Sequence, residues 1–316
     1  MLLSPSTCSM LGICVFLIIS QLNYILTTSV TPVYYYYEPK NNSFLTATIP
    51  IPPGSRSLSP TFRTDPPTEK FRSHSQKSRQ DILILSLFND KNDGFFVDLA
   101  ANMWEQDSNT YVLEYFNNWK GICIEPNPVF LEDLLANRKC TTVTTPVSKT
   151  NGEIVKFRFH WNGGIGGIVG EEFDNHGDIP QVDKLVPATT LTNLLDAMNA
   201  PPIIEYLSLD VEGAEHYVLQ GLDPRRYTFL VVTIERPKHH SHHILSLYGY
   251  RFLYQMADFG ECVYINQKMP DFKSIFEKYY QVGRIPDWHN MKRPYLLYPR
   301  WNESYTGVGY HTTDHN

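Results

Sequence analysis

Three acidic side chains lie at the ends of short apolar segments that are typical of buried strands. Asp98 lies near the end of residues 95–99, Glu125 ends residues 121–125, and Asp210 ends residues 206–210. Glu125 follows Asp98 after one predicted helix, an arrangement in which a carboxylate binds the hydroxyls of a ribose. Because parallel strands end at one edge of a sheet, we expect the three carboxylates to converge on one crevice. A single acid there could simply be solvated, but three in step with the strands favour a shared binding site.

An alternation of strand and helix patterns would position these acids. The expected strands are residues 95–99, 121–125, 141–147, 206–210, 227–234, 250–255 and 262–265. The expected helices are residues 108–118, 128–138, 190–198, 214–220 and 242–248. This alternation predicts a doubly wound α/β fold, in which helices cover both faces of a mostly parallel sheet.

Several segments within this region resemble the FkbM-type methyltransferases. They are FVDLAAN at 96–102, SNT at 108–110 with LE at 113–114, WKGICIEPNP at 119–128, LSLDVEGAE at 207–215, IERP at 234–237 and GY at 249–250. The resemblance covers about residues 81–266. It implies a Rossmann-like fold of the class I methyltransferase type, with a seven-stranded, mostly parallel sheet and an antiparallel final strand. The implied cofactor is S-adenosylmethionine.

The resemblance also implies which residues contact the cofactor. Those expected to hold its methionine end are Asp98, Ala100 and Asn102. Glu125 would bind the ribose, while Val147 and Ser148 would face the adenine. The matched motifs add further cofactor-binding candidates, namely Ser108, Asn109, Thr110, Pro126, Asn127 and Asp210.

The candidate catalytic residues are Asp210, Glu212 and Glu215, which would form a polar floor near the reactive methyl group. A base at this position can take the proton of an acceptor hydroxyl while the protein aligns the two reactants. Glu215 has a second interpretation, because a negative charge in the first turn of a helix stabilises that helix.

The turn after the first strand departs from the family pattern. The family has a glycine-rich turn there, whereas this chain has Ala100-Ala101-Asn102-Met103-Trp104. Glycine allows positive φ angles and a close approach of the backbone to the cofactor. Trp104 would either stack over the ligand on a rerouted loop or partly fill the cleft. Two functions therefore stay open: a methyltransferase, favoured by the three acids, or a non-catalytic membrane-anchored trafficking or binding protein on a degenerate methyltransferase fold.

The N-terminal region predicts entry into the secretory pathway. The first 37 residues carry no charged side chain, and Leu11–Ile19 is continuously apolar. We interpret residues 1–30 as an uncleaved signal anchor, with a cleaved signal peptide as the alternative. The anchor would place a lumenal catalytic domain at the Golgi or endoplasmic reticulum membrane, and cleavage would release a secreted protein. Sequons at Asn41 and Asn302 agree with both.

The flanking segments differ in composition from the main domain. Residues 31–80 are rich in Pro and Ser and predict a flexible stem. Residues 267–316 form an aromatic and Pro-rich C-terminal extension, which either packs across the domain or stacks on the sugar rings of a glycan acceptor. Of the five cysteines, Cys123, Cys140 and Cys262 lie within the main domain, so at least one of these three must remain unpaired or pair elsewhere.

Other ligand classes are disfavoured. The net charge of −6 and the lack of a basic run argue against nucleic acid as a partner. We predict no metal site, because the histidines of 239–243 lie in a polar segment without a carboxylate or cysteine at ligand spacing. The glycine-rich run 163–167 lacks the Lys-Ser/Thr of a phosphate loop and is more typical of a flexible flap over the substrate site.

Overall fold

The computed structural model describes residues 33–48, 73, 75, 78–160, 166–170, 173, 181–257 and 259–281. The predicted signal anchor, the sequon at Asn302 and most of the C-terminal extension lie outside these residues. Among the helices of the described part, none is both long and apolar enough to cross a membrane.

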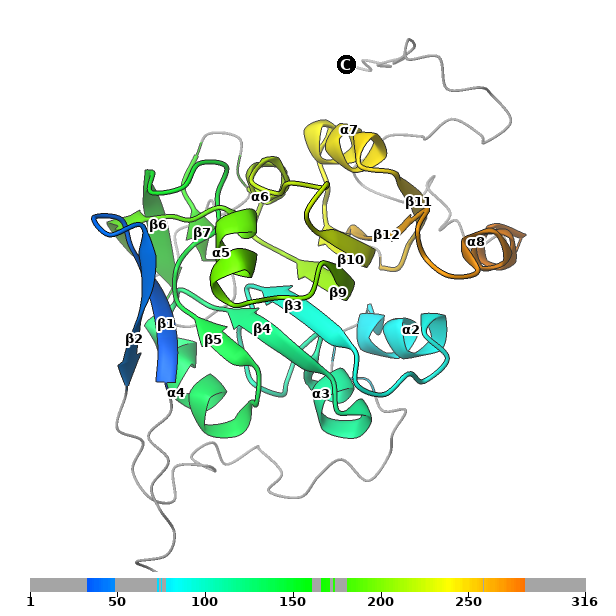
Figure 1. The fold of residues 1–316 in the computed structure, drawn as a ribbon, viewed down its shortest axis with the longest axis horizontal. Helices are drawn as coiled ribbons and strands as arrows, with labels where there is room; N and C mark the ends of the chain where they lie inside the picture. Colours follow the sequence, from blue (N-terminus) through cyan, green and yellow to red (C-terminus); the bar gives the residue numbers. More distant parts are fainter. Residues whose placement is uncertain are drawn as a thin grey trace, which may run out of the picture.

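The described residues build one large sheet of nine strands in the order β11-β12-β10-β9-β3-β4-β5-β1-β2 (Figure 1). Its strands are β1 (Val33–Glu38), β2 (Ser43–Thr48), β3 (Phe95–Leu99), β4 (Lys120–Ile124), β5 (Thr141–Val143), β9 (Ile203–Leu209), β10 (Thr228–Glu235), β11 (Tyr250–Gln255) and β12 (Glu261–Asn266). The central strands β10, β9, β3, β4 and β5 are parallel, and β1 continues the parallel pairing beside β5. β12 runs antiparallel to both of its neighbours, β10 and β11. The predicted mixed α/β fold with a large, mostly parallel sheet is thereby confirmed.

The sheet is larger than the seven strands expected, because β1 and β2 add a hairpin at the edge beyond β5. For residues 33–48 the prediction of a flexible stem was therefore wrong. Tyr37 is buried and packs against Phe44 of β2, while its backbone N–H donates to Thr145 Oγ1. Pairing with β1 thus covers an edge that would otherwise expose unpaired backbone groups of β5. The strand pattern of residues 33–48 was not recognised in the sequence, because the Pro-rich residues that follow dominate the composition of residues 31–80.

Helices cover both faces of the sheet, as a doubly wound fold requires (Figure 1). One face carries α2 (Gln80–Leu87), α3 (Tyr111–Asn117), α4 (Pro128–Asn137) and α8 (Phe272–Gln281). The other carries α5 (Leu191–Ala197), α6 (Glu215–Gln220) and α7 (His239–Leu247). Side chains alternate along β3 between these two cores: Phe96 packs on the α3 side, whereas Val97 and Leu99 pack on the α5 side.

A separate three-stranded antiparallel sheet lies beside the main one. It consists of β6 (Ile154–His160), β7 (Gly167–Ile168) and β8 (Gln181–Pro187) in the order β7-β6-β8. β7 and β8 were not expected from the sequence. The third predicted strand, residues 141–147, is shorter than expected, and Val147 instead forms an isolated parallel bridge with Thr189.

One disulfide and one aromatic contact join segments around the main sheet. Cys123 of β4 and Cys140, just before β5, form a disulfide, which leaves Cys262 as a buried thiol. The described part of the C-terminal extension forms α8, where Tyr279 stacks on Tyr254 of β11 with ring centroids 5.8 Å apart. Residues 267–281 therefore pack against the domain.

Candidate functional site

The turn after β3 adopts the backbone conformation of a glycine-rich turn without containing glycine. Ala100 has φ of 63° and Asn102 has φ of 52°, both in the left-handed region. The backbone N–H groups of Ala100 and Ala101 donate to Ile124 O at 3.0 and 3.1 Å, which holds the turn against the end of β4. A left-handed alanine costs about 1–2 kcal/mol, so the contacts that hold this turn must offset that strain.

Glu125 reaches across from β4 to this turn. Its Oε2 accepts a hydrogen bond from the backbone N–H of Asn102 at 2.9 Å, and its Oε1 accepts one from Asn127 N at 2.7 Å. The pKa of Glu125 is raised to about 7, chiefly by burial and to a smaller extent by nearby Asp98, against the lowering effect of these two donors. A carboxylate has about four lone-pair sites, so these two hydrogen bonds leave part of the accepting capacity of Glu125 unused, while the side chain itself is buried.

Asp98 points to the opposite side of the sheet from the side chains of Val97 and Leu99. Its Oδ2 accepts a hydrogen bond from Thr110 Oγ1 at 2.6 Å, whereas its Oδ1 is buried with no hydrogen-bond partner among the described residues. Burial raises the pKa of this carboxyl. Asp98 is thus close enough to influence Glu125 electrostatically, but its hydrogen bond is directed into the core beside α3.

The candidates before α3 belong to the same internal network. Ser108 Oγ accepts a hydrogen bond from Tyr111 N at 3.2 Å, and Asn109 Nδ2 donates to Ser208 Oγ at 3.0 Å. Thr110 binds Asp98, as described above. The side chains of Ser108, Asn109 and Thr110 therefore hold the loop after β3 against the sheet.

Arg138, at the end of α4, lies at the centre of this network and was not identified from the sequence. Its guanidinium is fully buried and pairs with Glu114 at 3.3 Å. It also donates to Ser108 Oγ, Thr110 Oγ1 and the carbonyl of Trp104, at 3.1, 2.8 and 3.4 Å. No pattern in the sequence distinguishes this arginine from a solvated residue at a helix end.

Trp104 lies on the α3 side of the sheet. Its indole packs edge to face on Tyr111 of α3, with ring centroids 5.6 Å apart, and joins the apolar core on the α3 side of the sheet. It does not line the hollow at the strand ends. The large side chain is accommodated beside α3 because the loop is held there by Arg138.

A hollow lies at the carboxyl ends of β3, β4 and β5. Its walls combine predicted cofactor residues with residues of the small sheet, namely Leu99, Ala100, Ile124, Pro126, Pro146, Val147, Phe157, Gly166, Gly167, Ile168 and Val211. Its cavity volume of about 30 Å³ is far below the roughly 300–1,000 Å³ of small-molecule pockets.

Ser148 is buried beside this region, and its Oγ has no hydrogen-bond partner in the described part of the chain. Asn127 caps α4, since its Oδ1 accepts from Val129 N at 3.2 Å.

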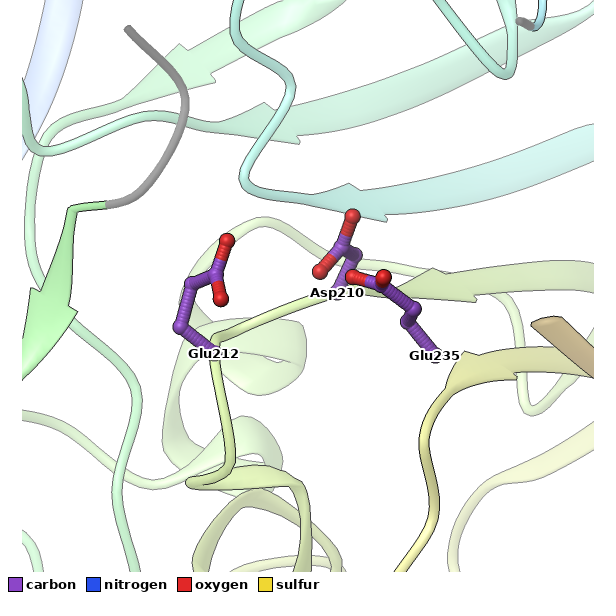
Figure 2. A group of neighbouring side chains, drawn as sticks. All are labelled: Asp210, Glu212 and Glu235. Atoms are coloured by element: carbon purple, nitrogen blue, oxygen red, sulfur yellow. The ribbon is translucent and has the colours of Figure 1, made fainter. Parts of the chain in front are cut away.

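A second acidic group lies at the ends of β9 and β10 (Figure 2). Carboxylate oxygens of Asp210, Glu212 and Glu235 lie within 4.8 Å of one another. Leu209 and Ile234 are partners in the parallel register, which brings the following residues, Asp210 and Glu235, side by side. Asp98 thus acts on Glu125, and Asp210 lies with Glu212 and Glu235. The convergence of all three predicted acids on one crevice stays a prediction.

Crowding and burial make Asp210 hard to ionise. Burial is the largest cause that raises its pKa well above the usual range, and Glu235 is the next. Arg236 pairs with Glu212 at 3.0 Å and with Glu235 at 3.2 Å. Three carboxylates at this spacing could also ligate a hard cation, but Arg236 already neutralises part of their charge. Glu235 was missed as a site residue, although it directly follows the predicted strand 227–234.

Glu215 holds the loop between β9 and α6. Its Oε1 accepts hydrogen bonds from the backbone N–H groups of Gly213 at 2.9 Å and Val211 at 3.3 Å. It also lies in the first turn of α6, where a negative charge is favourable. This geometry favours the interpretation of Glu215 as a residue that stabilises the loop and helix.

The comparisons with known proteins give one clear relationship. No curated protein matches the sequence. A solved structure, precorrin-6y C5,15-methyltransferase from Geobacter metallireducens, is similar with a TM-score of 0.32 and 13% sequence identity, over 58% of this chain and 78% of that one. A TM-score this low establishes neither a shared fold nor a shared function. The family model described as the methyltransferase FkbM domain matches residues 91–254, just over half of the chain, and includes the turn after β3, Glu125 and Asp210. The chain therefore belongs to the FkbM methyltransferase domain family.

Proposed function

We propose that this protein is an S-adenosylmethionine-dependent methyltransferase that methylates a hydroxyl group. The observation that carries the proposal is the contact between Glu125 and the left-handed turn at Ala100–Asn102. A carboxylate at the end of one strand and a tight turn at the end of the next form the usual ribose-binding corner of a Rossmann-like sheet. The buried Oδ1 of Asn102, which has no partner among the described residues, adds an acceptor beside this corner.

The residues of the chain would divide the work between binding and proton transfer. S-adenosylmethionine supplies a methyl group already activated by its sulfonium. Glu125 would accept the ribose hydroxyls, Ala100 would lie near the methionine end, and Val147 would form an apolar wall beside the adenine. In its ionised form Asp210, which lies beside Glu235, would take the proton of the acceptor hydroxyl. The raised pKa makes this carboxylate a stronger base than an ordinary one, and it also means that only the fraction of Asp210 that is ionised can act.

We further propose that the acceptor is a glycan or another molecule of the secretory pathway, and that the domain faces the lumen of the Golgi or endoplasmic reticulum. The Cys123–Cys140 disulfide supports this location, because disulfides persist mainly in oxidising compartments. The uncharged N-terminal segment of the sequence supports attachment to a membrane, with secretion as the outcome if that segment is cleaved.

The second candidate function is a non-catalytic binding or trafficking protein on the same fold. The small volume of the hollow favours this non-catalytic function, because a cavity of about 30 Å³ cannot hold a nucleoside unless one of its walls moves. The wall formed by Gly166, Gly167 and Ile168 belongs to the small sheet rather than to the main one. In the enzyme hypothesis this glycine-containing wall is the part that moves outward.

Calorimetric titration of the purified full-length chain with S-adenosylhomocysteine, the demethylated product, separates the two functions. The enzyme hypothesis predicts binding by the wild type. It predicts roughly 10- to 100-fold weaker binding by Glu125→Gln, the loss expected for one or two hydrogen bonds to a charged group. Glu132→Gln is the matched control, because Glu132 is exposed on α4. Lack of binding by a folded wild type would favour the non-catalytic function.

A further inference from the structure

The turn of the β1–β2 hairpin presents an asparagine of an N-glycosylation sequon at the surface. Residues 39–42 form the turn, and Asn41 within it is exposed. Asn41, Asn42 and Ser43 match the acceptor pattern N-x-S. Sequons arise by chance, so the question is whether this one has the geometry of an acceptor.

The two neighbouring asparagines have different hydrogen-bond partners. Asn42 has a left-handed φ of 47°, and its Oδ1 accepts hydrogen bonds from Tyr37 Oη at 2.7 Å and Asn151 Nδ2 at 2.6 Å. Asn42 therefore fastens the turn to the segment that follows β5. The Nδ2 of Asn41 lies 3.4 Å from Glu38 Oε2, an exposed and long contact. Solvent or an enzyme can replace such a contact at little cost.

The hairpin also places this turn clear of the packed core. β1 runs parallel to β5, and Tyr35 pairs with Val143, the last residue of β5. Tyr36, Tyr37 and Glu38 continue β1 beyond that point, so the turn extends past the end of β5 (Figure 1). A bulky group on Asn41 would project from the edge of the sheet where the parallel strands end, without displacing a buried side chain.

We propose that Asn41 is N-glycosylated. The Nδ2 nitrogen would form a bond to the anomeric carbon of an oligosaccharide carried on a polyisoprenoid diphosphate. The bond from that carbon to the diphosphate oxygen breaks, the diphosphate leaves with the electron pair, and the amide nitrogen loses one proton. The proposal rests on the lumenal location proposed above, because this donor and its transferase act on chains that enter the endoplasmic reticulum.

The test uses the full-length chain expressed in animal cells, with Asn302→Gln as the background so that only the first sequon is counted. Treatment with a glycosidase that cleaves N-linked glycans should increase the mobility of this protein and convert Asn41 to Asp, as detected by mass spectrometry. Asn41→Gln and Ser43→Ala should abolish the shift. Ser43→Thr, which keeps the sequon at the same position, should retain it.

A protease-protection assay of the same chain in microsomes distinguishes the possible failures. A protected chain that shows no glycan at Asn41 would overturn the proposed modification and leave the lumenal location standing. A chain that the protease degrades would overturn the location and, with it, the modification. Neither result changes the titration with S-adenosylhomocysteine, so the methyltransferase proposal is judged separately.

Discussion

Removal of the Arg138 guanidinium should destabilise the protein more than any surface charge substitution. Arg138→Met keeps most of the apolar stem but removes five N–H donors. It would leave Glu114 without its buried ion pair and Thr110 without one of its hydrogen bonds. Breaking a buried pair by removing one partner costs about 3–5 kcal/mol. We expect a loss of this size in the free energy of unfolding measured in urea.

The loop after β3 should loosen at the same time. Arg138 is bonded to the carbonyl of Trp104 and to Ser108, which lie in the loop that begins with the strained turn at Ala100. Amide hydrogen exchange in residues 101–110 should therefore be faster in Arg138→Met, and S-adenosylhomocysteine should bind more weakly. Arg138→Lys should restore little of this effect, because an ammonium group cannot reproduce the planar fork.

Arg225→Met provides the control for a lost arginine. Arg225 pairs with Asp223 at 2.9 Å but is 87% exposed, and such surface pairs contribute little to stability. We expect no measurable change in unfolding or in exchange of the loop. Equal effects of the two substitutions, or an Arg138→Met variant with wild-type exchange in residues 101–110, would refute the argument that Arg138 holds this loop.

Three other groups should respond to pH or to substitution. Because the pKa of Glu125 is raised to about 7, its carboxylate is ionised at pH 8 and mostly protonated at pH 6. Binding of S-adenosylhomocysteine should therefore weaken about tenfold when the pH is lowered from 8 to 6. Calorimetry of Glu125→Gln should show no such dependence on pH. Ionisation of Asp210 beside Glu235 opposes folding, so stability is lost as pH rises through the raised pKa of Asp210. Asp210→Asn should therefore stabilise the fold by about 0.5–2 kcal/mol at pH 8 and by less at pH 5, and equal shifts in thermal melts at both values would contradict this. Cys140→Ala removes the Cys123–Cys140 disulfide, whose cysteines are 17 residues apart. The free energy of unfolding in urea should fall by about 3 kcal/mol. A reductant should destabilise the wild type but not this variant.

The sequence predicted the central architecture because its strands and helices carry strong local patterns. The buried segment at Phe95–Leu99 and the helix that begins at Pro128 appear where expected, since apolar runs and an N-terminal proline are local signals. β1 was missed because it pairs with β5, more than 90 residues away along the chain, and β2 was missed because it pairs with β1. β8 was missed because three of its seven residues are exposed and give no clear alternation.

The sequence predicted some of the contacts at the site but not all of them. The sequence placed Glu125 beside the turn after β3, because both follow neighbouring strands. It could not show that Asp98 bonds into the core beside α3, since the direction of a side chain near a strand end depends on the local pleat. It also could not show that Arg138 holds the loop, because this contact joins residues that are about 30 positions apart.

A thermodynamic cycle between Glu125 and the ribose of the ligand tests the central claim most directly. The wild type and Glu125→Gln are each titrated with S-adenosylhomocysteine and with its analogue lacking both ribose hydroxyls. If Glu125 binds these hydroxyls, their removal should weaken binding to the wild type roughly 10- to 100-fold and should weaken binding to Glu125→Gln far less. Equal losses in the two proteins would show that the ribose lies elsewhere and would contradict the proposed site.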